Sequence, residues 1–187
     1  MPMNKIPVLD KGYVALYATS LTAVQINDIL IRYFYSKPAM RMLDTVEVYM
    51  EIRCPIFVQL ILNQYNLTSF TQHSRKVEAY IPSINDISAP DLSTGQIIKR
   101  DIEQTTEALL INPQAYKTDG CDHFVSQVVT PINVYNTLMV SGSLTTWWSI
   151  ARRDDLPNAI NAYTHAIADV LEAEYSGLRE FLDGKKK

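Results

Sequence analysis

The stretch from Thr45 to Arg53 limits the fold more than any other part of the sequence, because its residues alternate in character. Apolar side chains point to one face and polar or aromatic side chains to the other, as in a β-strand. This alternation predicts an antiparallel strand with one face buried and the other wet or lining a site. The apolar set is Val46, Val48, Met50 and Ile52, and the opposite set is Glu47, Tyr49, Glu51 and Arg53.

The strand is followed at once by Pro55 and by an almost wholly apolar run from Ile56 to Leu62. Proline fits the first turn of a helix, where its missing N–H costs no hydrogen bond. A helix that is apolar on all sides is a buried one. The run therefore predicts a buried helix from about Pro55 to Leu67.

The remaining segments give the order of elements. Turn residues at Asp10–Gly12 lead into a short strand. Helical spacing marks Leu21–Tyr35, with Thr22 as the expected cap and Pro38 as the stop. The other expected elements are a strand at Val77–Pro82, a loop at Ser83–Ser93, an apolar run at Leu144–Ile150, and helices at about Gly95–Ile111, Asp119–Asn136 and Pro157–Leu182. This order predicts an α+β fold in a single domain over residues 1–187, with helices packed on an antiparallel sheet and a solvated tail at 183–187.

Composition excludes several classes of protein. The formal net charge is −3, from 17 Lys and Arg against 20 Asp and Glu, so no strong positive field is available to coat nucleic acid. No apolar run reaches the roughly 20 residues that cross a bilayer, and the N-terminal segment lacks the apolar core of a signal peptide. Two cysteines, Cys54 and Cys121, and three histidines form no metal-ligand pattern. We therefore expect a cytoplasmic protein with no metal, no membrane contact and no nucleic-acid partner.

A polar stretch from Thr68 to Lys76 brings hydroxyl, amide, imidazole and cationic groups close together. The backbone N–H groups of a turn, with the Ser74 hydroxyl, Arg75 and Lys76, have the chemistry to hold a phosphate. The alternative is an ordinary polar loop, and the residues alone favour it because no glycine-rich phosphate loop is present. His73 lies in the same stretch and is a candidate proton carrier.

Three further clusters have both a chemical and a structural interpretation. Arg152–Asp155 has the charge to reach an anion, but its two signs also pair readily at the start of a helix. Glu47 and Glu51 share a strand face, where burial would make them an acid/base pair and solvent would leave them a wet surface. Trp147–Trp148 suits stacking on a ring, the core or a subunit interface. The structural interpretation is the simpler one in each case, and His165 receives no role.

Three segments together resemble the flavin-dependent thymidylate synthases, the ThyX family. They read VLDKGYVAL at Val8–Leu16, VEVYMEIRCPIFVQLIL at Val46–Leu62, and a terminal part with an aromatic pair, an Arg, a Pro and AYTHAIADVL. The resemblance covers most of the chain. It implies the ThyX fold and methylene transfer to C5 of dUMP or a related nucleotide. It also implies FAD, methylenetetrahydrofolate and NADPH as cofactors, and a homotetramer whose sites lie between subunits.

The family signature, RHRxxSxNExSxR, aligns with residues 64–76, which begin in the last part of the predicted buried helix. Both of its serines are kept, as Ser69 and Ser74, but its Arg-His-Arg triplet is replaced by neutral residues. Loss of these charges beside a doubly anionic cofactor is not conservative. By the resemblance, the cofactor residues are Gln64, Tyr65, Asn66 and Ser69, the nucleotide residues are Gln72, Ser74, Arg75, Lys76, Gln127 and Arg152, and the catalytic residues are Ser74 and Arg152.

Other family motifs also differ here. Ala39–Asp44 takes the place of a motif with His and Glu that serves flavin and folate, and Ser141–Gly142–Ser143 aligns with an Asn-Ala-Arg motif. Gln127 replaces an Arg that grips the nucleotide phosphate. Gln72 replaces the Glu that reads the pyrimidine, although its amide can still hydrogen-bond a base edge. Arg152 or Arg153 keeps the place of the Arg beside the pyrimidine.

Two functions follow from the resemblance and its departures. The first is an enzyme that modifies a pyrimidine deoxynucleotide, with reduced FAD supplying the hydride. The second is a catalytically inactive paralogue that keeps the fold and binds nucleotide, or joins an intact partner subunit in an oligomer. Family membership favours the first, and the lost charges favour the second. The lost charges also predict weak or absent FAD binding.

Overall fold

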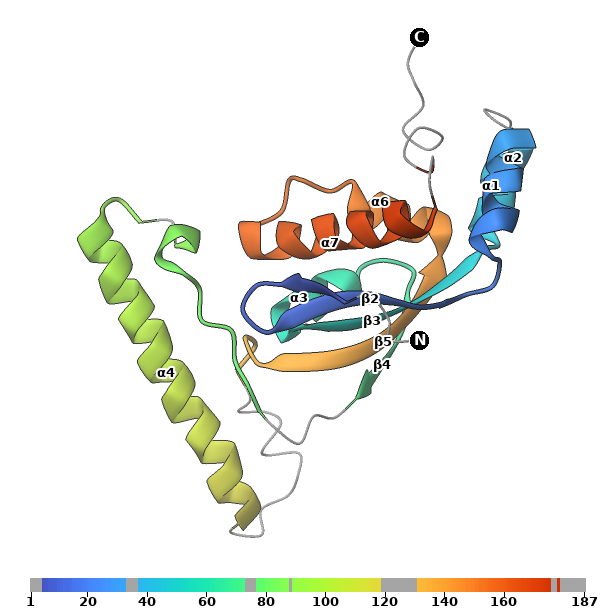
Figure 1. Ribbon diagram of the computed structural model, residues 1–187. Coiled ribbons are helices and arrows are strands. Elements are labelled where there is room, and N and C mark those ends of the chain that lie inside the picture. Colours follow the sequence, from blue (N-terminus) through green and yellow to red (C-terminus); the bar gives the residue numbers. More distant parts are fainter. Residues whose placement is uncertain are drawn as a thin grey trace.

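The computed structural model describes residues 5–32, 37–72, 77–87, 89–118, 131–175 and 178. Figure 1 shows a twisted sheet with helices over one face and one long helix, α4, that stands away from it. This arrangement confirms the predicted α+β fold with helices packed on an antiparallel sheet. In chain order the elements are β1 (Ile6–Val8), β2 (Gly12–Thr19), α1 (Ala23–Arg32), α2 (Lys37–Asp44), β3 (Glu47–Pro55), α3 (Ile56–Leu62), β4 (Thr68–Gln72), the 3₁₀ turn η1 (Ile84–Asp86), α4 (Leu92–Thr118), β5 (Tyr135–Ser143), α6 (Leu144–Ala151) and α7 (Asn158–Glu174).

The sheet has the strand order β1-β2-β3-β5-β4, and every neighbouring pair is antiparallel. β3 is the central strand, and its predicted alternation is confirmed. Val48, Met50 and Ile52 are completely buried, whereas Glu47 is exposed. β3 pairs along its whole length with β5, which comes much later in the chain. The centre of the sheet is therefore a long-range pairing.

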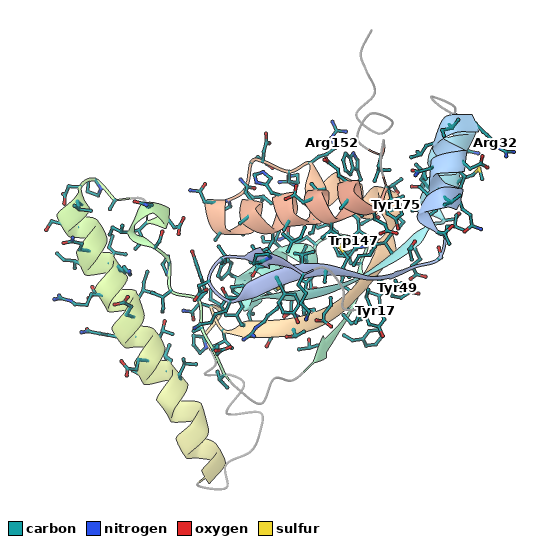
Figure 2. The ribbon with its side chains drawn as sticks, in the orientation of Figure 1. Tyr17, Arg32, Tyr49, Trp147, Arg152 and Tyr175 are labelled. Carbon is teal, nitrogen blue, oxygen red and sulfur yellow. The ribbon has the colours of Figure 1, made fainter. Side chains whose placement is uncertain are left out.

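The core lies between the sheet and the helices α6 and α7. α6 packs on β3 and β5, while α7 packs on β1, β2 and α6 (Figure 1). Trp147 is fully buried, and its indole N–H donates a 3.0 Å hydrogen bond to the Val48 carbonyl (Figure 2). Trp148 is also buried. Of the three interpretations of this tryptophan pair, the structure supports the core.

The predicted turn at Asp10–Gly12 joins β1 to β2 and brings α7 close to the sheet. The Tyr163 hydroxyl of α7 lies against Gly12 and donates a 2.9 Å hydrogen bond to the Arg53 carbonyl. A Cβ added at Gly12 would overlap that hydroxyl and would lie 2.8 Å from the carbonyl oxygens of Arg53 and Val8. Only glycine allows such a close approach between helix and hairpin.

The predicted cap of α1 is confirmed. The Thr22 hydroxyl accepts a hydrogen bond from the Gln25 N–H at 3.3 Å, and the Gln25 side-chain oxygen accepts one from the Thr22 N–H at 2.9 Å. Each side chain thus satisfies a backbone donor of the first turn, which fixes where the helix begins. The predicted helix at Leu21–Tyr35 is α1, Ala23–Arg32, and its last predicted residues lie outside the described part.

The largest error of the sequence prediction is β5. A helix was expected at about Asp119–Asn136, but Tyr135 and Asn136 begin a strand that runs to Ser143. Residues 119–130 of that expected helix lie outside the described part. Polar residues are interspersed through β5, where only Tyr135, Leu138 and Val140 are buried, so its alternation is weak.

β4 lies where a polar loop was expected, at Thr68–Gln72. It pairs only with β5 and forms an edge of the sheet. Edge strands carry exposed polar side chains, which hide the apolar alternation on which a strand prediction depends.

Smaller differences concern the ends of elements. The helix expected at Pro55–Leu67 ends at Leu62, and the strand expected at Val77–Pro82 is a single bridge between Ala79 and Val134. α4 begins earlier than the expected Gly95, because the Asp91 carboxylate accepts a 2.8 Å hydrogen bond from the Thr94 N–H and caps the helix.

Candidate functional site

A cleft of about 390 Å³ lies between the end of α6 and the outer face of α7. Residues of α7 that are three or four positions apart share one helix face, so His165, Asp169 and Glu172 all reach this cleft. The opposite wall comes from the last turn of α6 and the loop after it. The wall residues from that side are Trp148, Ala151, Arg152, Arg153 and Asp154.

Arg152 is a candidate site residue that lines the cleft, together with its alternative Arg153. It follows the last residue of α6, and its backbone N–H donates a 3.2 Å hydrogen bond to the Trp148 carbonyl. A cation at this end of a helix faces the negative end of the helix dipole. Figure 2 shows Arg152 at the outer side of the helical layer, away from the sheet. Arg152 thus contributes a positive charge to the wall of the cleft.

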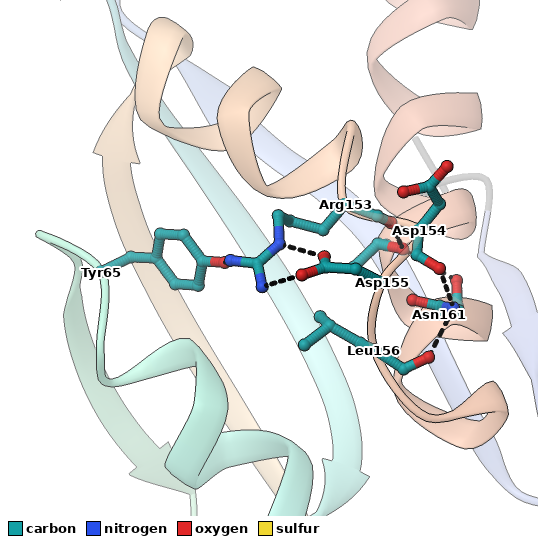
Figure 3. A network of polar contacts seen from close by, with 7 residues as sticks. Tyr65, Arg153, Asp154, Asp155, Leu156 and Asn161 are labelled. Carbon is teal, nitrogen blue, oxygen red and sulfur yellow. Dashed lines mark hydrogen bonds and ion pairs between the residues drawn. The ribbon is translucent and has the colours of Figure 1, made fainter.

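Arg153 has a different role. Its guanidinium forms a two-pronged ion pair with the Asp155 carboxylate, with 2.8 Å between Nη2 and Oδ2. It also donates a 3.0 Å hydrogen bond to the hydroxyl of Tyr65 (Figure 3). The hydrogen bond from Arg153 lowers the pKa of the Asp155 carboxyl, and the same contact raises the pKa of Arg153. The sequence left Arg152 and Arg153 as alternatives beside a ligand, and both of them line the cleft.

The loop from α6 to α7 is held by further hydrogen bonds. The Asn161 side-chain amide donates to the carbonyls of Asp154 and Leu156, at 3.0 and 2.7 Å (Figure 3). The Thr164 hydroxyl donates to the Arg153 carbonyl at 3.0 Å. Together with the Tyr65 contact, these bonds fix the loop that bears Arg152.

Residues that the resemblance assigns to the cofactor occupy the connection between α3 and β4. Gln64 and Asn66 are exposed, while Tyr65 and Ser69 are half-buried. Asn66 and Leu67 lie beside Gly142 of β5, where an added Cβ would overlap a methyl group of Leu67. The structure therefore brings the segment 64–66, which the resemblance assigns to the flavin, close to the segment 141–143, which aligns with the family's Asn-Ala-Arg motif.

The predicted nucleotide residues are placed only in part. Gln72 ends β4 at the edge of the sheet, whereas Arg152 lies beyond the helices that cover the sheet (Figures 1 and 2). The other residues assigned to the nucleotide, and the proposed proton carrier His73, lie outside the described part; those nucleotide residues are Ser74, Arg75, Lys76 and Gln127.

Glu51 is part of an ion pair and does not suit acid/base chemistry. Its carboxylate accepts hydrogen bonds from the Lys5 ammonium at 2.7 Å and from the Tyr13 hydroxyl at 2.5 Å. The contact with Lys5, followed by that with Tyr13, lowers the pKa of Glu51. A general acid needs a raised pKa, so the structural interpretation of Glu47 and Glu51 is supported.

A second, apolar cavity of about 540 Å³ lies beneath α4, between that helix and the residues that precede β5. Phe57, Tyr80, Ile98, Ile102 and Ile132 are among its walls. Across the described ranges we find no group of three or more His, Cys, Asp or Glu side chains that could hold a metal ion. The same ranges contain no helix that is long and apolar enough to span a membrane.

The sequence prediction missed His165 and Asp169, which line the cleft, and the hydrogen bond between Tyr65 and Arg153. The spacing of His165 and Asp169 on one face of a predicted helix is a signal that pointed to a shared surface. The hydrogen bond between Tyr65 and Arg153 joins segments that are far apart in the chain, so no local sequence pattern predicts it.

Comparison with known proteins supports the fold. No protein-family model and no curated protein matches the sequence. Among solved structures, the chain is similar to PolB from Streptomyces cacaoi, a UMP/dUMP methylase whose crystal structure contains 5-Br UMP. The similarity covers 95% of this chain and 96% of that one, with a TM-score of 0.72 and 13% sequence identity. At this identity, the comparison establishes that the two proteins share a fold.

Proposed function

We propose that this chain is a ThyX-type protein that binds a pyrimidine nucleoside monophosphate, and that the cleft with Arg152 is part of its site. The observation that carries the proposal is the shared fold, over nearly the full length of both chains, with a methylase that was crystallised with a uridine nucleotide. The residue-level resemblance to the ThyX family supports the same ligand class independently.

The described residues supply chemistry for such a ligand. Arg152 offers a planar cation that can hydrogen-bond a pyrimidine carbonyl or a phosphate. His165 and Asp169 add a donor and an acceptor on the facing helix. In the proposed site Gln72 reads the base edge, Ser74, Arg75 and Lys76 hold the phosphate, and Gln127 lies near that phosphate.

We propose that a complete site combines residues from two chains, because Gln72 ends the edge strand β4 whereas Arg152 follows α6 in the helical layer that covers the sheet. A closed homo-oligomer brings such surfaces together by symmetry. The resemblance to ThyX predicts a homotetramer, and light scattering at micromolar concentration tests it. A monomer that still binds nucleotide at full affinity would contradict the shared site.

Methylene transfer to C5 of the nucleotide is a second candidate function. It is favoured by the activity named for the structural neighbour, a UMP/dUMP methylase. In the ThyX family it requires FAD, methylenetetrahydrofolate and NADPH. Release of tritium from nucleotide labelled at C5, with all three supplied, tests this candidate separately from binding.

Calorimetric titration tests the binding proposal. We expect dUMP, UMP or dCMP to bind and AMP to bind far more weakly. Arg152→Ala should weaken binding by about tenfold or more, the cost of a hydrogen bond to a charged group. Arg32→Ala is the matched control, because Arg32 is an exposed arginine of α1 paired with Asp28 and remote from the cleft (Figure 2). Absence of heat with any pyrimidine nucleotide at millimolar concentration would refute the proposal.

A further inference from the structure

We propose that the position which the resemblance assigns to the flavin is closed in this chain, because the chain's own side chains form a packed junction there. The inference goes beyond nucleotide binding, since it concerns a different ligand and different residues. Three segments carry it: residues 64–66, residues 141–143, and Ala39–Asp44. Each contributes a described side chain or backbone group to contacts within the protein.

Tyr65 is the first part of the junction. Its hydroxyl accepts the 3.0 Å hydrogen bond from Arg153, whose guanidinium is already paired with Asp155. Gln64 and Asn66 on either side are neutral and exposed. None of these three side chains offers the cation that an anionic reduced flavin or a pyrophosphate needs. The nearby cation, Arg153, is held in an ion pair instead.

Gly142 and Ser143 form the second part. A side chain at position 142 has no room, because Leu67 fills the space beside Gly142 and the Trp147 indole nitrogen lies 3.6 Å from an added Cβ. The Ser143 hydroxyl accepts a 3.1 Å hydrogen bond from the Thr146 N–H and caps α6. This segment therefore serves packing and helix capping.

Asp44 forms the third part. Its carboxylate accepts a hydrogen bond from the hydroxyl of Thr145, in the first turn of α6. The preceding residue, Leu43, is completely buried in the core. The segment that corresponds to a flavin and folate motif thus ends in contacts with α6.

Ser143 and Asp44 bond to residues in the first turn of α6, Leu67 packs beside Gly142, and Tyr65 bonds to Arg153 beyond the other end of α6. Neither of the two cavities described above is lined by residues of these segments. A flavin at this position would have to displace Leu67 and the bonds of Ser143 and Asp44. Residues 64–66 and 141–143 offer no cation in return, and the one basic residue of Ala39–Asp44, Arg41, is exposed on α2. The residues present therefore do not fit the cofactor.

Hydrogen exchange of the intact protein, measured with and without FAD, tests the inference. At about 100 µM FAD, a concentration that detects affinities into the high micromolar range, we expect no added protection of residues 64–69 and 141–146. Protection of those residues, together with stoichiometric binding seen in the visible absorption of the flavin, would overturn the inference.

A variant that restores the lost cations tests the same inference by asking whether FAD affinity increases. The change Gln64→Arg with Tyr65→His and Asn66→Arg restores the lost triplet and releases Arg153 from Tyr65, so FAD affinity should rise. A parallel dUMP titration of each protein reports folding and nucleotide binding separately. If unmodified protein binds FAD as tightly as the triple variant, the inference fails whether or not dUMP binds. If dUMP does not bind but the exchange result holds, only the proposed function fails.

Discussion

Replacing Gly12 by alanine should destabilise the protein through one identifiable contact. The added methyl group would overlap the Tyr163 hydroxyl and lie 2.8 Å from the Arg53 and Val8 carbonyl oxygens. The backbone oxygens cannot rotate away, so Tyr163 must move and its 2.9 Å hydrogen bond to Arg53 must break. Overpacking of a core costs about 1–3 kcal/mol, and a buried group left without its partner adds about 1–3 kcal/mol.

We therefore expect Gly12→Ala to lower the free energy of unfolding by about 3 kcal/mol, measured by urea denaturation with an unchanged slope. Tyr163→Phe alone should cost about 1–2 kcal/mol, because it loses the hydrogen bond without a clash. In the double variant the hydroxyl that clashes is gone. Its loss of unfolding free energy should therefore be smaller than the sum of the two single losses by about 1 kcal/mol or more.

A matched control is Gly95→Ala in α4. There an added Cβ lies 3.1 Å from the terminal methyl group of Ile84, a side chain that can shift. Alanine in a helix is more favourable than glycine by up to about 1 kcal/mol, so this change should be neutral or stabilising. Additive losses for Gly12→Ala and Tyr163→Phe, or an equal loss for Gly95→Ala, would refute the reasoning.

Three further predictions concern stability and reactivity. Lys5 lowers the pKa of Glu51, so the pair stabilises the fold at pH values above the ordinary glutamate pKa of about 4.3. That contribution is lost as the pH falls through the lowered pKa. In Glu51→Gln, the urea midpoint should therefore depend less on pH in the acid range. Burial raises the pKa of the Cys54 thiol to about 12. In a Cys121→Ser background, a thiol reagent at mildly alkaline pH should therefore react with Cys54 only after the protein unfolds. Rapid reaction of the native protein would contradict the burial. Gly142→Ala should destabilise the protein less when Leu67→Ala clears the space, and equal losses in both backgrounds would count against the junction.

The parts of the fold that could be predicted from the sequence are those with a strong local signal. β3 alternates without interruption and is buried on one face, and Pro55 marks the start of the helix after it. β5 and β4 could not be predicted in this way. β5 interleaves polar residues with its apolar ones, and β4 is an edge strand whose side chains are largely exposed. Their pairing is set by long-range contacts, which local patterns do not report.

The candidate site follows the same division. The sequence identified Arg152 and the segment around Tyr65 as residues of interest, through the resemblance to ThyX. It did not indicate that Tyr65 would bond to Arg153, or that His165 would face the same cleft as Arg152. Both facts depend on how α6 and α7 pack on the sheet. Chemistry that is assembled by tertiary packing becomes visible only when the fold is known.

Equilibrium dialysis of the intact protein against dUMP and FAD together tests the central claim most directly, because both ligands are measured on the same folded sample. The account predicts that dUMP is enriched on the protein side of the membrane, whereas FAD reaches the same concentration on both sides. Stoichiometric retention of FAD, or loss of dUMP from protein that is still folded, would contradict it.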